Sequence, residues 1–139
     1  MLIGQYQHSI DIKGRLIVPA KFREDLGDTF IVTKGLDNCL FIFHFDEWKA
    51  LEAKIRELPF SKARDLQRFF FSGAIEVELD KQGRILLPQV LRDYASLTKD
   101  ITVIGAQNRA EIWNSDMWNS QNEALSNDRI AEVMEQLGF

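Results

Sequence analysis

The sequence contains a single cysteine, Cys39, and has no long apolar run. One cysteine excludes an internal disulfide framework and a cysteine-based zinc site, and it is typical of a reducing compartment. The densest apolar stretch, residues 39–43, is far short of the roughly 18 residues needed to span a bilayer. The first eight residues carry no cationic lead into an apolar run, so no signal peptide is predicted. We therefore expect a cytoplasmic protein without a membrane partner.

An excess of positive charge is also missing. The chain has 17 Lys and Arg against 21 Asp and Glu, a net charge of -4, which excludes a generally basic chromatin-coating protein. Six of the acidic residues and only one Arg lie in residues 111–139, so residues 1–110 carry +1. Residues 11–24 and 54–68 are locally basic. Charge alone leaves open whether these stretches are solvated surfaces or contact an acidic partner.

The signatures of common enzyme classes are absent as well. The chain has no P-loop, G-x-S-x-G, H-E-x-x-H or G-x-G-x-x-G pattern. His44 is expected at a strand end, and Cys39 is expected to be a buried small hydrophobe. Asp11 and Asp80 are each followed four residues later by an Arg that would neutralise them, which disfavours a carboxylate pair. We expect no catalytic residue, metal, cofactor or small-molecule substrate.

What the sequence does contain is an internal repeat. Residues 11–19, DIKGRLIVP, align with residues 80–88, DKQGRILLP, with Asp, Gly, Arg and Pro at the same places. After a one-residue shift the match resumes at four pairs: Gly35 and Gly105, Asn38 and Asn108, Asp46 and Asp116, and Trp48 and Trp118. Self-similarity of this kind is typical of a duplicated supersecondary unit, here about forty residues long.

Local rules predict the same order of elements in each unit. A strand precedes the Asp-x-x-Gly-Arg turn, in which glycine is free to take a positive φ. A short aliphatic strand follows and ends at Pro, which begins a helix. Two more strands come next, and Asp46 or Asp116 is expected to cap a Trp-containing helix. The predicted elements are helices 20–26 and 89–95 and strands 30–33, 40–43, 101–104 and 110–113.

The predicted organisation is a first repeat at residues 1–52, a helical connector at 53–76, a second repeat at 77–120 and an acidic tail at 121–139. Neither half has enough strands to bury its apolar faces, so the two repeats are expected to intertwine as one compact barrel. Six aromatic residues are expected to pack in the core: Phe60, Phe69, Phe70, Phe71, Trp113 and Trp118. The tail is either a docking helix or a frayed end.

With Asp-x-x-x-Arg-x-x-x-Pro present twice, the sequence resembles the MraZ family, bacterial transcriptional regulators built from two tandem AbrB/SpoVT-type modules. The resemblance extends over roughly residues 1–120. It implies a mainly β fold with short helices (α+β), a swapped-hairpin β-barrel of two repeats related by a pseudo-twofold, and a C-terminal helix.

The resemblance also implies a function. It implies sequence-specific binding to repeated short boxes in the double-stranded promoter DNA of the cell-division and cell-wall gene cluster, with repression expected. It further implies ring-like homo-oligomers of eight or more subunits and association with the nucleoid. A non-catalytic AbrB-type interaction module, or an antitoxin-like one, remains the alternative.

Candidate DNA contacts lie in the repeated motif. Alternate residues of a strand point to one side, so Lys13 and Arg15 would share a face if the strand begins at Lys13. Arg suits bidentate contact with guanine, and a β-ribbon can enter the major groove. Because Gln82 replaces Lys13, we expect the second half to contribute less electrostatically. The predicted DNA-binding residues are Lys13, Arg15, Lys81, Gln82 and Arg84.

Other motif residues have an expected structural role. Asp11, Gly14, Asp80 and Gly83 are predicted to organise the turns, because a carboxylate repels phosphate and accepts hydrogen bonds. An Asp–Arg ion pair that only pins each turn remains the alternative to DNA contact by the Arg. Two further residues, Arg23 and Arg92, are either phosphate contacts or solvated. So few cations predict weak binding per protomer, which an oligomer on repeated boxes would strengthen.

Overall fold

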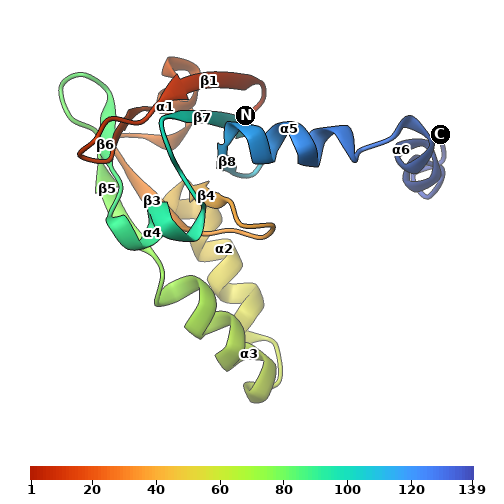
Figure 1. Ribbon diagram of the computed structural model, residues 1–139. Coiled ribbons are helices and arrows are strands. Elements are labelled where there is room, and N and C mark those ends of the chain that lie inside the picture. Colours follow the sequence, from red (N-terminus) through yellow and green to blue (C-terminus); the bar gives the residue numbers. More distant parts are fainter.

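A computed structural model, which describes residues 1–139, contains a six-stranded antiparallel sheet and a separate two-stranded ribbon (Figure 1). The order of strands in the sheet is β1-β7-β8-β4-β3-β5, and the ribbon pairs β2 with β6. The strands are β1 (Gln5–Ser9), β2 (Arg15–Ile17), β3 (Thr29–Lys34), β4 (Leu40–Phe43), β5 (Ile75–Glu78), β6 (Arg84–Leu86), β7 (Asp100–Gly105) and β8 (Ala110–Asn114).

Short helices lie between and after these strands, so the α+β class is confirmed. Both helices predicted after the prolines form, and the connector is helical as expected. The helices are α1 (Ala20–Leu26), α2 (Phe45–Arg56), α3 (Phe60–Leu66), the π-helix η1 (Gln67–Phe71), α4 (Gln89–Tyr94), α5 (Ser115–Glu123) and α6 (Asn127–Glu135). None of them is both long and apolar enough to cross a membrane.

The two repeats exchange strands. β1 of the first repeat pairs with β7 of the second, β5 of the second pairs with β3 of the first, and β2 pairs with β6. The closed barrel expected from the sequence does not form, because β2 and β6 pair only with each other and leave β1 and β5 as the edges of an open sheet. The three-residue ribbon strands run into Pro19 and Pro88, which lack the N–H that a longer ladder would need.

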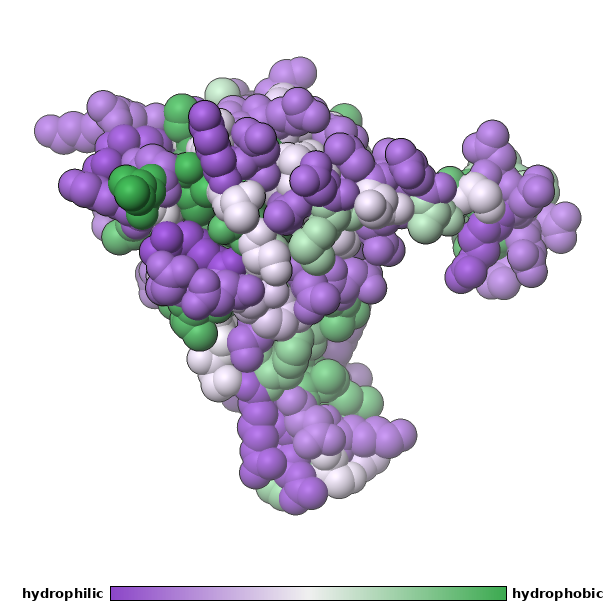
Figure 2. Space-filling model, viewed as in Figure 1, coloured by the Kyte–Doolittle hydropathy of each residue, from purple (hydrophilic) through white to green (hydrophobic).

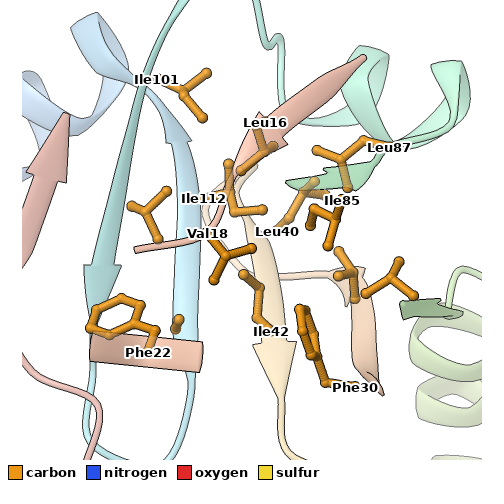
Figure 3. Packing of buried hydrophobic residues seen from close by; sticks show 14 of the residues in the cluster. Leu16, Val18, Phe22, Phe30, Leu40, Ile42, Ile85, Leu87, Ile101 and Ile112 are labelled. Carbon is orange, nitrogen blue, oxygen red and sulfur yellow. The ribbon is translucent and has the colours of Figure 1, made fainter. Parts of the chain in front are cut away.

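The main hydrophobic core lies between the ribbon and the sheet and draws on both repeats (Figure 3). Leu16 and Ile85, on the inner face of the ribbon, are each 1% exposed. Ile42 and Ile112 of the sheet and Phe22 of α1 belong to the same cluster. Burying one such side chain is worth about 1.5–3 kcal/mol. Because the two ribbon strands come from different repeats, this core forms only when both are present.

A second, aromatic cluster packs the connector against the other face of the sheet. The rings of Trp48 in α2 and Phe71 in η1 are 4.6 Å apart, and Thr33 donates a 2.6 Å hydrogen bond to the Phe70 carbonyl. Of the six aromatics expected in the core, Phe60 is 76% exposed at the start of α3. Phe70 and Trp113 are buried in this cluster, and the other three, Phe69, Phe71 and Trp118, are partly buried against it. A helix N-terminus facing solvent explains the exposure of Phe60.

The predicted caps of the two Trp-containing helices are wrong by two residues. His44 and Asn114 occupy the cap positions, and their side chains accept the backbone N–H of Asp46 at 3.0 Å and of Asp116 at 2.9 Å. Asp46 and Asp116 instead lie in the first turn, where a carboxylate interacts favourably with the helix dipole. His44 is therefore a capping residue at the end of β4, in keeping with its expected place at a strand end.

The acidic tail is helical and stands apart from the rest of the molecule. Figure 1 shows α5 leading away from the sheet and α6 at its far end. No residue of α6 is buried. The tail is thus not a frayed end, because α6 is a formed helix. In the single chain α6 is also not docked on another element, because none of its residues is buried.

Candidate nucleic-acid interface

The two motif turns, which we name tip 1 (residues 11–15) and tip 2 (residues 80–84), are each built around the carboxylate of the leading Asp. Asp11 Oδ1 accepts the backbone N–H groups of Lys13 and Arg15, both at 2.9 Å, while Oδ2 accepts Arg15 Nε at 2.8 Å. Tip 2 repeats this arrangement around Asp80. Each Asp therefore accepts the backbone N–H groups of its own turn.

These hydrogen bonds also lower the pKa values of the two carboxyl groups. The pKa of Asp11 lies below its ordinary value, chiefly because the backbone N–H of Arg15 stabilises the carboxylate, with the Arg15 side chain adding to the effect. The Arg84 backbone and side chain act in the same way on the pKa of Asp80. Both carboxylates are ionised at neutral pH and hold the turns in one conformation.

The ion pair and DNA contact are compatible roles for each Arg. Only Nε of Arg15 and of Arg84 bonds to the Asp, at 2.8 Å in both tips, and Nη1 and Nη2 have no hydrogen-bond partner in the chain. The side chains remain 36% and 27% exposed. The Asp fixes the direction of the guanidinium and leaves two N–H-bearing nitrogens for an outside acceptor. Bidentate contact with guanine needs a pair of donors of this kind.

Lys13 lies in the turn and not in the strand. β2 begins at Arg15, so the alternation that would place Lys13 and Arg15 on one face does not apply. The same holds for Gln82, because β6 begins at Arg84. Lys13 and Gln82 are exposed at equivalent places, and so is Lys81. Their positions follow from the Asp-centred turn, which turns residues 12–13 and 81–82 outward.

Tip 1 is held against the second repeat. The Gly14 carbonyl accepts the Leu87 N–H at 2.8 Å, and Arg92 donates from Nε to the Leu87 carbonyl at 3.0 Å. Gly14 has φ +91°, and a Cβ there would lie 2.6 Å from the Leu87 oxygen and 2.8 Å from Arg92 Nε. Glycine is required both for the backbone angle and for this close approach.

Tip 2 is held in the same way by the first repeat. The Gly83 carbonyl accepts the Val18 N–H at 3.0 Å, and Arg23 Nε donates to the Val18 carbonyl at 2.8 Å. Any Cβ on Gly83 would collide with the Arg23 guanidinium. Arg23 and Arg92 are therefore half-buried supports for the tip of the opposite repeat. Sequence reasoning missed this role, although the recurrence of Phe22-Arg23 as Leu91-Arg92 was its signal.

The tips continue into the ribbon, whose outer face combines cationic and apolar side chains. Arg15 lies opposite Leu86, and Ile17 opposite Arg84. Ile17 is 41% and Leu86 59% exposed. In Figure 1 both tips and the ribbon lie on the edge of the molecule away from α5 and α6. The result is a two-stranded surface with pseudo-twofold symmetry and one Arg from each repeat.

The two tips differ in charge because different residues lie beside them. Ile10, before tip 1, donates to the Lys99 carbonyl, whereas Leu79, before tip 2, donates to the Asp28 carbonyl. A hollow of about 480 Å³ beside tip 1 is lined by residues that include Asp11, Ile12, Arg92 and Lys99. Sequence reasoning missed Lys99, because only the pairing of β1 with β7 brings it to tip 1.

With these neighbours included, tip 1 carries a net charge of +3 and tip 2 a net charge of +1. The groups at tip 1 are Lys13, Arg15, Arg92 and Lys99 against Asp11, and those at tip 2 are Lys81, Arg84 and Arg23 against Asp80 and Asp28.

Two further titratable side chains, Cys39 and His8, have shifted pKa values. Cys39 is fully buried, and burial raises its pKa to about 12, so it is a neutral thiol. His8 Nε2 is buried without a hydrogen-bond partner, and burial together with nearby Arg23 lowers the pKa of His8. No cluster of three or more His, Cys, Asp or Glu side chains is placed to hold a metal ion.

Comparison with known proteins identifies similar chains along the whole length. A family model described as "MraZ protein, putative antitoxin-like" matches residues 1–69 and again residues 70–138. Proteins named Transcriptional regulator MraZ are 56% identical in Acetivibrio thermocellus and 58% identical in Alkaliphilus metalliredigens, over 100% of both chains. The protein of that name from Natranaerobius thermophilus is 58% identical over 95% of each chain.

Proposed function

Because this chain belongs to the MraZ family, we propose that it is a sequence-specific DNA-binding transcriptional regulator. One observation carries the proposal: each repeat presents an Arg whose Nε is held by an Asp and whose other nitrogens have no partner, on a single two-stranded surface. An antiparallel ribbon of this width fits the major groove of B-DNA. In this position Arg15 and Arg84 donate to guanine O6 and N7.

The charge distribution supports unequal roles for the two tips. Tip 1, at +3, is the main contact, with Lys13 and Lys99 approaching the phosphate backbone beside the bases that Arg15 contacts. Tip 2, at +1, contacts DNA more weakly, through Arg84, Lys81 and the neutral Gln82. Arg23 and Arg92 act first on the tips they support, and their outer nitrogens reach phosphates.

The target and the assembly are parts of the same proposal. We propose that the protein binds repeated short boxes upstream of its own gene and of cell-division and cell-wall genes, as a repressor, and that it does so as a ring-like homo-oligomer. A tip of charge +3 neutralises only a few phosphates, so one protomer binds weakly at physiological salt. Several protomers on adjacent boxes gain affinity through effective concentration.

The tail provides a surface for such assembly. Ile130, Val133 and Leu137 are 43%, 45% and 72% exposed, and no residue of α6 is buried. Exposed aliphatic residues on and just after a helix that projects from the body are typical of a protein–protein contact. Ile130→Asp should lower the solution mass measured by light scattering. An unchanged mass would remove α6 from the proposed assembly.

DNA binding is tested by titrating a fragment from upstream of the protein's own gene against an unrelated fragment of equal length. Arg15→Ala should abolish the preference for the upstream fragment, and Arg15→Lys, which keeps the charge, should restore affinity but not preference. Because the exposed Asp11–Arg15 pair is worth at most about 1 kcal/mol, the melting temperature should change little. Equal binding of both fragments by the wild type would refute the proposal.

A further inference from the structure

Tip 1 presents an aliphatic side chain that the fold does not bury. Ile12 is 96% exposed, a higher exposure than that of any other large apolar residue of the chain. The neighbouring residues hold it there: Asp11 accepts the N–H groups of Lys13 and Arg15, and this closes the turn with Ile12 on its outer side. A hydrogen-bonded turn thus displays Ile12 outward.

Folding gives no reason for an aliphatic residue at this place. Tip 2 has the same hydrogen bonds and the same supported glycine, and its equivalent residue is Lys81. The same hydrogen-bonded turn therefore forms with a charged, exposed side chain at this position. The isoleucine at tip 1 has to be explained by something outside the chain.

The surroundings of Ile12 point to the chemistry of its partner. Asp11 and Lys13 flank it, and Arg15 follows in the same turn. Arg92 and Lys99 line the hollow beside it, so cations outnumber the one carboxylate. A second copy of tip 1 would bring the same +3 charge against it. A partner that matches this surface carries negative charge for the cations and an apolar group for Ile12, and the projecting turn has to be able to reach that group. The major groove of a duplex has these properties, because thymine places its C5-methyl group there between two phosphate backbones.

We propose that Ile12 packs against the C5-methyl group of a thymine next to the base pair contacted by Arg15, and that tip 1 thereby selects thymine at that position. The inference depends on the proposed DNA binding and adds a specificity-determining residue to it. Ile17 and Leu86, on the outer face of the ribbon, extend the apolar part of the same surface. Tip 2, with Lys81 in this place, makes no such selection.

The test removes the methyl groups from the DNA and the side chain from the protein separately. The upstream fragment is amplified with either thymine or uracil, which differ only in the C5-methyl group. The affinity ratio between the two fragments is then measured by fluorescence anisotropy for the wild type and for Ile12→Ala. Burial of one methyl group is worth about fourfold in affinity, so the ratio should fall about fourfold per bound protomer in Ile12→Ala.

Two more variants control this comparison. Leu36→Ala truncates an aliphatic residue, 58% exposed, in the β3–β4 turn on the opposite side of the molecule, and it should keep the wild-type ratio. Ile12→Lys copies tip 2 and should lose thymine preference while binding the uracil fragment at least as well as the wild type does. Effects of uracil on the shape of the duplex act on all variants alike and cancel in the comparison.

Three outcomes would overturn the inference, and they are distinguishable. An unchanged ratio in Ile12→Ala, with preference for the upstream fragment intact, refutes thymine selection and leaves the proposed function standing. A lower solution mass of Ile12→Ala without DNA would show that Ile12 contacts another copy of the chain. If the wild type shows no preference for the upstream fragment over unrelated DNA, the proposed function itself fails, and the inference fails with it.

Discussion

The unequal charge of the two tips leads to a paired experiment on Lys13 and Gln82, which occupy equivalent places. Both side chains are exposed on ordered turns, and neither makes a side-chain hydrogen bond in the chain. Lys13→Gln gives tip 1 the residue that tip 2 has at this one place, and Gln82→Lys does the reverse, so neither exchange disturbs packing. These two variants therefore change the charge of a tip without changing the stability of the fold.

The expected magnitude follows from counterion release. Each phosphate that a cation neutralises contributes about 0.9 to the slope of log affinity against log salt. Lys13→Gln lowers the charge of tip 1 from +3 to +2, so the slope should become shallower by about 0.9 per bound protomer. Between 50 and 200 mM salt this amounts to about a 3.5-fold change per protomer. Gln82→Lys should steepen the slope by as much if tip 2 touches DNA.

Anisotropy titrations of the upstream fragment at several salt concentrations measure the slope, and mass photometry gives the number of bound protomers. Lys54→Gln is the matched control, because it makes the same change of charge on an exposed part of α2, remote from the tips in Figure 1. Screening over about 10 Å at 0.1 M salt should leave its slope unchanged. If Lys13→Gln alters the slope no more than Lys54→Gln does, Lys13 does not contact phosphate.

Two other predictions concern the close packing of Gly14 in tip 1 and the pH dependence of stability that the partly buried His8 causes. Gly14→Ala places a Cβ within 2.6 Å of the Leu87 oxygen at φ +91°. The free energy of unfolding should therefore fall by about 2–3 kcal/mol, and the melting temperature measured by calorimetry should fall by roughly 6–10 °C. The variant should also lose DNA binding. Gly27→Ala, which strains the backbone but meets nothing within 4 Å, should melt lower and still bind DNA; equal binding by the two variants would contradict the argument. The pKa of His8 is lowered by burial and by Arg23, so the unfolded chain takes up the proton first and stability should decline as pH falls below about 6.5. Melting curves of His8→Phe should lack this component, and a parallel decline in both proteins would assign the pH dependence to other groups.

The distribution of hydrophobic residues on the surface, coloured in Figure 2, shows why surface hydropathy alone does not identify a binding site. Purple atoms cover most of the visible face, and green atoms gather over α2 and α3 and in small groups elsewhere. Singly exposed apolar residues are normal on a folded protein and carry no information by themselves. Ile12 gains meaning only from its ordered turn and from the cations around it.

Some features could be predicted because they depend on near neighbours in the chain. The Asp-centred turns form from hydrogen bonds between residues two and four apart, so the motif determines them in both repeats. Pro19 and Pro88, the N-cap residues directly before α1 and α4, predicted both helices for the same local reason. The predicted N-cap positions of α2 and α5 were wrong, because Ser, Asn, Asp and also His side chains can all accept a backbone N–H at a helix start. Only the backbone conformation in the folded chain shows which of these residues is the cap.

Other features depend on residues far apart in the sequence, and only the tertiary structure decided them. The sequence by itself determined a duplicated unit and two arginine-bearing turns, because periodicity and turn chemistry are local. It did not determine that β1 and β5 remain open edges, that Arg92 covers Gly14 and Arg23 covers Gly83, or that Lys99 lies beside tip 1. Each of these follows from pairing between repeats, where many alternatives share the same local pattern and burial of one common core selects among them.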